Sequence, residues 1–232
     1  MDVGLIELGD AADFIVVNNL QDFVVNSTYC QGIFLTTDGQ SLLPSVPVTP
    51  MKKFAAEEIL TSDLHLPAAG KTVRVIAVED GQLITTEKHL PVYIEHGEVA
   101  AHLKADVLKL VVVNRYQTAP PRVALVHNFR LQRGAIPASV GDDSHNIVAV
   151  GTTDEEICAA MNGIIQVKGG IAVGEANSVE VLPLPIALLI AADDGYGVAQ
   201  KYAHLHNRAK ELSSLLIAPF MTLSFMALLV IP

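Results

Sequence analysis

The chain has 232 residues, enough to bury a sizeable core as one large domain or two small ones. Its 15 Lys and Arg residues against 25 Asp and Glu residues give a net charge of −10 without a basic patch, so no nucleic-acid partner is expected. Cys30 and Cys158 lie far apart, which is typical of reduced thiols in a cytoplasmic protein, and no export signal begins the sequence.

Short β-type runs occupy residues 4–37. The runs FIVV at 14–17 and FVV at 23–25 stand among turn signals at Gly9–Asp10 and Gln31–Gly32. The pattern predicts a small β-sheet, with two hairpins as its simplest arrangement. We expect a structural role for this segment.

A change in composition follows. Residues 38–70 carry Pro, Ser and Thr, with one short helical candidate at 52–60, and Gly70 opens a new β-rich region. We therefore predict three parts: β-strands at 1–45, a linker at 46–68, and a larger domain at 69–232.

The larger domain mixes strands and helices. Apolar β-type runs predict strands at 72–79, 81–94, 106–116, 121–129, 146–151, 170–175 and 178–184, the last two as a hairpin. Thr153 is a candidate N-cap for a helix that runs to about Val167, and a second helix is expected over 194–213. The predicted fold class is α+β, or α/β, with a mixed sheet and two main helices.

The C-terminal run at 215–232 is 18 residues long and carries no charge. That is barely the length of a membrane span, and Pro219, Thr222 and Ser224 interrupt it. We expect a core segment rather than a membrane partner, with a membrane-tethered tail as the alternative.

The densest polar chemistry lies between the strands predicted at 121–129 and 146–151. Arg130 and Arg133 come first, then a predicted Gly-Ala-Ile-Pro turn, and then five consecutive polar residues: Asp142, Asp143, Ser144, His145 and Asn146. Polar loops at strand ends often hold ligands. The alternative is a polar turn whose side chains satisfy one another. As the sole metal site the cluster is poor, because no second His or Cys stands nearby at a ligand spacing.

Two other patterns are weaker. His204 and His206 have the H-x-H spacing that binds a metal on a strand, but their surroundings are helical, which favours a solvated helix face. The glycines at 169, 170 and 174 lack a following Lys-Ser/Thr, which rules out a phosphate loop.

The run RLQRGAIPASVGDDSHNIVAVGTTDEE, at 130–156, closely resembles the C-terminal region of bacterial adenine deaminases of the amidohydrolase superfamily. The resemblance continues through LPLPIALL at 182–189 and PFMTLSFMALLVIP at 219–232. Three positions depart from the family pattern. Asp142 stands where the family has His, and Asn114 and Tyr116 stand where it has Glu and His.

The resemblance implies a part of a larger enzyme. Residues 4–37 look like the closing passage of an amidohydrolase, whose strands complete a small β-sandwich beside a barrel that binds a divalent metal (Mn, Fe or Zn). No barrel ligands are recognisable here, so we expect no cofactor in this chain. The implied function is that of the C-terminal portion of an adenine deaminase, which converts adenine and water to hypoxanthine and ammonia.

By the same resemblance, this portion has a lid, accessory or assembly role and is inactive alone. Its substrate-proximal residues would be Arg133, Asp142, Asp143, Ser144, His145 and Asn146. Hydrophobic residues make up 50% of the chain, which favours a homo-oligomer through exposed apolar surface. The alternative function is a non-catalytic binding or oligomerisation domain.

Overall fold

The computed structural model describes residues 7–44, 46–47, 49, 53–176 and 178–228. The chain divides into two compact units, Met1–Thr49 and Pro50–Pro232. The parts of the predictions that fall on residues 1–6, 45, 48, 50–52, 177 and 229–232 lie outside the described residues.

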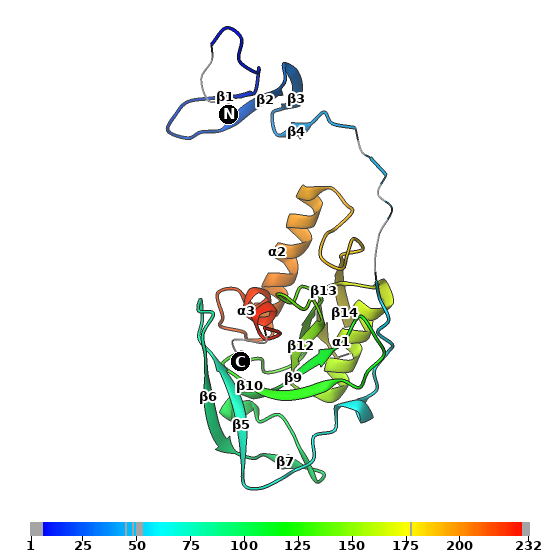
Figure 1. Cartoon of the computed structure of the whole chain (residues 1–232). Coiled ribbons are helices and arrows are strands. Elements are labelled where there is room, and N and C mark those ends of the chain that lie inside the picture. The colour runs from blue at the N-terminus through cyan, green and yellow to red at the C-terminus, as the bar shows by residue number, and fades with distance from the viewer. Residues whose placement is uncertain (1–6, 45, 48, 50–52, 177, 229–232) are drawn as a thin grey trace. The chain divides into compact units, whose positions relative to one another are not determined.

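The first unit is a four-stranded antiparallel sheet in the order β1-β2-β3-β4 (Figure 1). Its strands are β1 (Phe14–Val17), β2 (Val25–Cys30), β3 (Ile33–Thr37) and β4 (Gln40–Ser41). The hairpin between β2 and β3 turns at the expected pair, where Gln31 and Gly32 both adopt left-handed φ angles of 51° and 74°.

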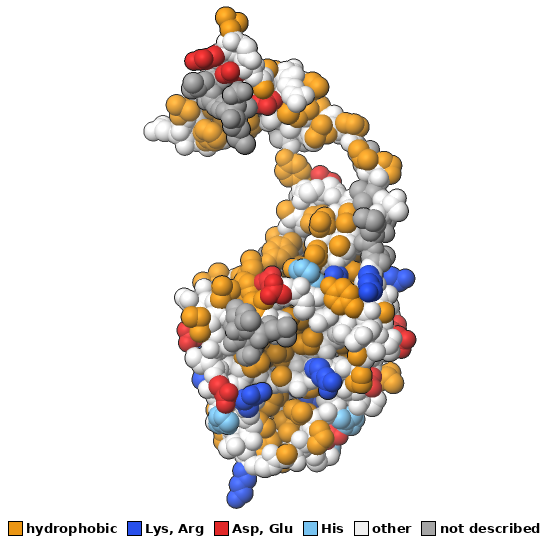
Figure 2. All heavy atoms as spheres, viewed as in Figure 1, with side chains coloured by type: hydrophobic (Ala, Val, Ile, Leu, Met, Phe, Trp, Pro, Cys, Tyr) orange, Lys and Arg blue, Asp and Glu red, His pale blue; other side chains and the backbone are white. Residues whose placement is uncertain are grey.

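This small sheet has no core of its own. The ring of Tyr29 packs against the rings of Phe14 and Phe34, with centroids 4.7 and 5.1 Å apart. Yet no described residue between 7 and 49 is buried. Figure 2 shows hydrophobic side chains on the surface of this unit.

The second unit is built on an eight-stranded sheet in the order β14-β13-β11-β12-β9-β10-β5-β6. Neighbouring strands are antiparallel except β10 and β5, which are parallel, so the sheet is mixed as the sequence predicts. Its strands are β5 (Thr72–Val78), β6 (Thr85–Pro91), β9 (Val107–Val113), β10 (Arg122–His127), β11 (Ala135–Ala138), β12 (Ile147–Gly151), β13 (Gly170–Glu175) and β14 (Ser178–Pro183). Smaller elements are β7 (Ile94–Glu95), β8 (Glu98–Val99), and the 3-10 helices η1 (Thr61–Leu64) and η2 (Leu103–Ala105).

Both faces of this sheet are covered. On β12, Val148 and Val150 join one hydrophobic cluster, whereas Ile147 and Ala149 join the other, as the alternation of a strand requires. Helix α1 (Asp154–Val167) packs on the second face, and α2 (Gly195–Glu211) and α3 (Pro219–Phe225) contribute to the first. The result is an α+β architecture, as predicted.

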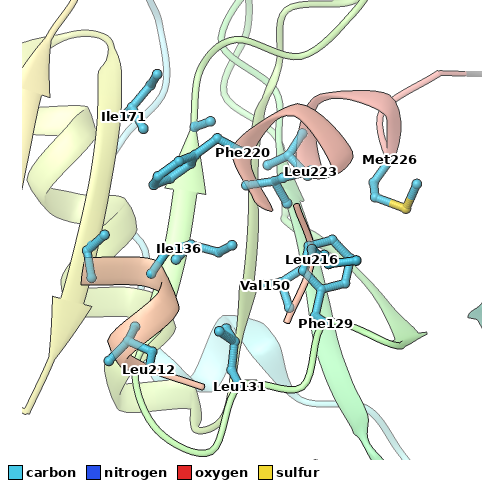
Figure 3. Packing of buried hydrophobic residues seen from close by; sticks show 14 of the residues in the cluster. Phe129, Leu131, Ile136, Val150, Ile171, Leu212, Leu216, Phe220, Leu223 and Met226 are labelled. Atoms are coloured by element: carbon cyan, nitrogen blue, oxygen red, sulfur yellow. The ribbon is translucent and has the colours of Figure 1, made fainter. Parts of the chain in front are cut away.

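Figure 3 shows the first cluster from close by, with Phe220 and Leu223 extending from α3 toward side chains of the sheet. Phe220, Leu223 and Leu216 are almost completely buried, with exposed fractions of 4%, 0% and 2%. The uncharged C-terminal run therefore contributes to the core, although Leu215, Ile217 and Met221 within it are exposed. No helix in the described part of the chain is long and apolar enough to cross a membrane.

The two main helices begin where the sequence indicates. The hydroxyl of Thr153 accepts a hydrogen bond from the Glu156 amide at 3.2 Å, and the carboxylate of Asp194 accepts one from the Gly197 amide at 2.9 Å. Both are N-caps that satisfy free amides of the first turn.

Three expectations need correction. Residues 53–60 contain no helix, and Ile59 is buried with the side chains of α1. The Gly-Ala-Ile-Pro segment is not a turn, because Ala135–Ala138 forms β11 in the interior of the sheet. The C-terminal run also contains a third helix, α3, that the sequence reading did not predict.

Candidate functional site

The predicted polar turn connects β11 to β12 and is anchored on the end of α3. The amide of Asp142 donates to the carbonyl of Ser224 at 3.0 Å, and the Ser224 hydroxyl donates to the Asp142 carboxylate at 3.4 Å. The amide of His145 closes the turn on the carbonyl of Gly141 at 2.7 Å. Asp143 is exposed, and the other four polar residues are half-buried.

The end of β9 lies beside this turn. The backbone amide of Arg115 donates to the Asn146 side-chain oxygen at 3.4 Å. The Asn114 side-chain oxygen in turn accepts from the Tyr116 amide at 2.8 Å. The segment that carries two of the three departures from the family pattern therefore adjoins the turn that carries the third, Asp142.

Arg115 joins three segments at this place. Its Nη1 donates to the carbonyl of Ala187 at 2.6 Å, and its Nη2 donates to the hydroxyl of Tyr116 at 2.8 Å. The guanidinium carbon lies 4.6 Å from the centre of the Tyr116 ring, within cation-π range. Only 7% of Arg115 is exposed, although Tyr116 is 39% exposed. A buried guanidinium thus lies directly behind an accessible aromatic ring.

Arg133 does not join this group. It precedes β11, whereas the polar turn follows that strand, and its Nε donates to the carboxylate of Glu175 at the end of β13. Glu175 also pairs with Arg208 of α2, at 3.1 Å. Its hydrogen bonds to Arg133 and Arg208 hold the pKa of the Glu175 carboxyl below its usual value. The structure therefore brings together five of the six predicted site residues and assigns Arg133 to a charge network elsewhere.

That charge network includes one histidine of the H-x-H pair. His204 contacts the Glu180 carboxylate at 2.6 Å, and Arg208 donates to the same carboxylate at 2.8 Å. Both His204 and His206 lie on α2, and the ring of His206 faces Tyr202 at a centroid distance of 6.5 Å. A solvated helix face is thus the arrangement observed.

The residues present do not fit a divalent metal. Within the described ranges, no group of three His, Cys, Asp or Glu side chains is placed to hold an ion. The polar turn contributes a single imidazole, whose chain neighbours are bonded within the turn. We therefore derive no chemical step through a metal in this part of the chain.

Sequence reasoning missed a buried charge pair next to a cavity. Lys109 of β9 is 4% exposed and lies 2.7 Å from a carboxylate oxygen of Asp154, the first residue of α1. Both line an open cavity of about 340 Å³, together with Glu98 and Thr152. The signal was present, because Lys109 is the one charged residue in an otherwise apolar strand.

Comparison with known proteins now identifies the family. Residues 82–232 match the family model described as the adenine deaminase C-terminal domain. The chain belongs to this family. It is 41% identical to an adenine deaminase of Methanosarcina mazei over 100% of this chain and 44% of that protein.

Two further members of the family are similar to this chain to the same extent. An adenine deaminase of Parabacteroides distasonis is 42% identical over 99% of this chain and 42% of its own length. One of Salinibacter ruber is 42% identical over 100% of this chain and 43% of its own length. The resemblance stated from the sequence is thereby confirmed, and the chain spans less than half the length of these relatives.

Proposed function

We propose that this chain is the C-terminal portion of an adenine deaminase, an enzyme that converts adenine and water to hypoxanthine and ammonia. The observation that carries the proposal is the similarity to proteins named adenine deaminase along the whole of this chain, at 41 to 42% identity. The match includes the polar turn and the strand ends around it, and such strand ends commonly bear ligand sites.

Within such an enzyme, we assign this portion a lid, accessory and assembly role. The substrate-proximal residues are Asp142, Asp143, Ser144, His145 and Asn146. Arg133 is kept in the proposed set, although its side chain pairs with Glu175 in the charge network and not with the polar turn. A divalent metal, Mn, Fe or Zn, is assigned to the preceding part of the enzyme.

The proposed domain organisation is a β-sandwich segment at 1–45, a linker at 46–68 and an α+β domain at 69–232. The coreless sheet of the first unit supports the first assignment, since a sheet that buries nothing requires a partner layer. Cys30 and Cys158 are both free, which supports a cytoplasmic location.

Two measurements test the function. The chain alone, with added Mn²⁺, Fe²⁺ or Zn²⁺, should release no ammonia from adenine. A chimera in which this chain replaces the matching part of the Methanosarcina mazei relative should deaminate adenine. An inactive but folded chimera contradicts the assignment.

The second candidate is a non-catalytic oligomerisation domain. The exposed aromatic face of the first unit favours it, because large exposed apolar patches mark association sites. A chimera that forms the parent's assembly but lacks activity supports this candidate over the first.

A further inference from the structure

Two buried side-chain nitrogens beside the polar turn have no hydrogen-bond partner among the described residues. They are Nε of Arg115 and Nδ1 of His145. The antiparallel register ends with Val113 paired to Ile147, and the Arg115 amide just beyond it donates to the side chain of Asn146, the residue next to His145. Unsatisfied polar atoms of this kind are rare in native proteins, so two at one strand end need an explanation.

The charge of Arg115 is also uncompensated. Among the described residues, the ion pairs engage other side chains, and Arg115 takes part in none of them. A guanidinium stays protonated in proteins, and a buried charge without a partner is costly. A group that supplies an acceptor from outside this chain would remove that cost.

The backbone around these nitrogens is strained. Ala187, which accepts from Arg115, and Leu188 have φ angles of 54° and 68°, in the left-handed region that side chains disfavour. In the turn, Asp143 and His145 have φ angles of 60° and 47°. Strain that gathers in one place marks functional sites more often than structural ones.

The unpaired atoms match one ligand chemistry. Nε–H of Arg115 is a donor, and Nδ1 of His145 is an acceptor when its proton is on Nε2. One edge of adenine offers a ring-nitrogen acceptor, N7, beside the donor of the 6-amino group. The carboxylates of Asp142 and Asp143 in the adjoining turn disfavour an anionic ligand, which leaves a neutral base.

We propose that Arg115 and His145 form a recognition pair for the purine, with Nε–H donating to N7 and Nδ1 accepting from the 6-amino group. This inference rests on the proposed function. The exposed ring of Tyr116 supplies a face on which a base can stack. Both nitrogens are covered in this structure, so binding of the base requires a local rearrangement that uncovers them.

The test follows the Nε–H resonance of Arg115 by NMR in the 232-residue chain, and the backbone amide resonance of Tyr116 in that chain and in every variant. Adenine should shift this resonance saturably, with a Kd of about 1 mM. 7-Deazaadenine, in which CH replaces N7, should bind about tenfold more weakly. Arg115→Met should bind both bases equally weakly. Arg130→Met, a matched change at an exposed arginine whose Nε donates to Asn128, should bind as the original chain does.

Three results overturn the proposal: no shift with adenine up to its solubility limit, equal affinity for the two bases in the original chain, or unchanged discrimination in Arg115→Met. A thermal melt checks that the variant is folded, and Arg115→Lys replaces it if it is not. Failure of the proposed function is separate. An active chimera with a chain that ignores adenine removes only the recognition pair, and an inactive chimera with a chain that binds adenine removes only the deaminase assignment.

Discussion

Lys109, in the middle of β9, donates hydrogen bonds to both carboxylate oxygens of Asp154 at the start of α1, at 2.7 and 2.8 Å. Its third donor reaches the carbonyl of Leu64 at 3.2 Å. One buried ammonium therefore joins the central strand, the first turn of α1 and the end of η1. Removal of the carboxylate would leave a buried charge unpaired.

We expect Asp154→Ala to lower the free energy of unfolding by about 3 kcal/mol, because breaking a largely buried pair leaves Lys109 uncompensated. The exposed neighbour provides the control: Glu155→Ala, in the same helical turn, should change stability by under about 0.5 kcal/mol. Urea denaturation monitored by circular dichroism measures both. Equal losses in the two variants would show that Lys109 does not depend on Asp154.

The charge network on α2 predicts that the stability of the fold decreases at acidic pH. Hydrogen bonds from His204 and then Arg208 hold the pKa of the Glu180 carboxyl below its usual value of 4.5. Because the pKa of Glu180 is lower in the folded state than in the unfolded state, its interactions stabilise the fold at pH values above the unfolded-state pKa. That stabilisation is lost as the pH falls through the folded-state pKa. Glu180→Gln should therefore flatten the fall in stability below about pH 4.5. Urea midpoints at a series of pH values measure this, and Glu87→Gln, on the edge strand β6, is the control.

The exposed rings of the first unit predict self-association. Phe14 and Phe34 flank Tyr29 on the small sheet and are 37% and 40% exposed. We expect the chain to sediment as a homo-oligomer, and Phe14→Ser with Phe34→Ser to reduce its mass toward the monomer. Leu83→Ser, a comparably exposed position in the second unit, should leave the assembly intact. A monomer at high concentration before any substitution would refute the prediction.

The departure at Asp142 predicts a gain of activity in the chimera. A second carboxylate beside Asp143 adds negative charge to the proposed purine site, and Asp142→His removes it. The variant should raise kcat/KM for adenine about tenfold. Asp142→His also removes the carboxylate that accepts from the Ser224 hydroxyl. Asp142→Asn removes the same charge but keeps an acceptor for that hydroxyl, so it serves as the comparison. Equal rates for all three chimeras from pH 6 to 9 would make the turn a structural cap.

Much of the α+β domain could be predicted from local patterns. Helix α1 has a capping threonine and apolar residues at helical spacing, and the strands around it are apolar runs of the expected length. Strand β11 escaped prediction because Pro137 stands within it. Proline has no backbone N–H to donate to a neighbouring strand, so its presence predicts a turn. Strand β11 nevertheless pairs with β12 on one side and β13 on the other.

The candidate site was only partly predictable, for a different reason. The polar turn is contiguous in sequence and could be found there, whereas Arg115 is a single cation after a strand, and Ala187 belongs to an apolar run. The pairing of β9 with β12 sets Arg115 beside the turn, and Ala187 is linked to it by the hydrogen bond to Arg115. Proximity in sequence likewise does not reveal that β11 separates Arg133 from the turn.

The single parallel contact of the large sheet has a mechanical consequence. Strand β5 is joined to β6 by seven residue pairs, but to β10 by only two, Ile76 with Val126 and Ala77 with His127. Strand β5 is therefore paired more extensively with β6 than with β10. We expect thermal opening to begin between β5 and β10. We expect amide hydrogens between β5 and β10 to exchange with solvent earlier than those between β5 and β6.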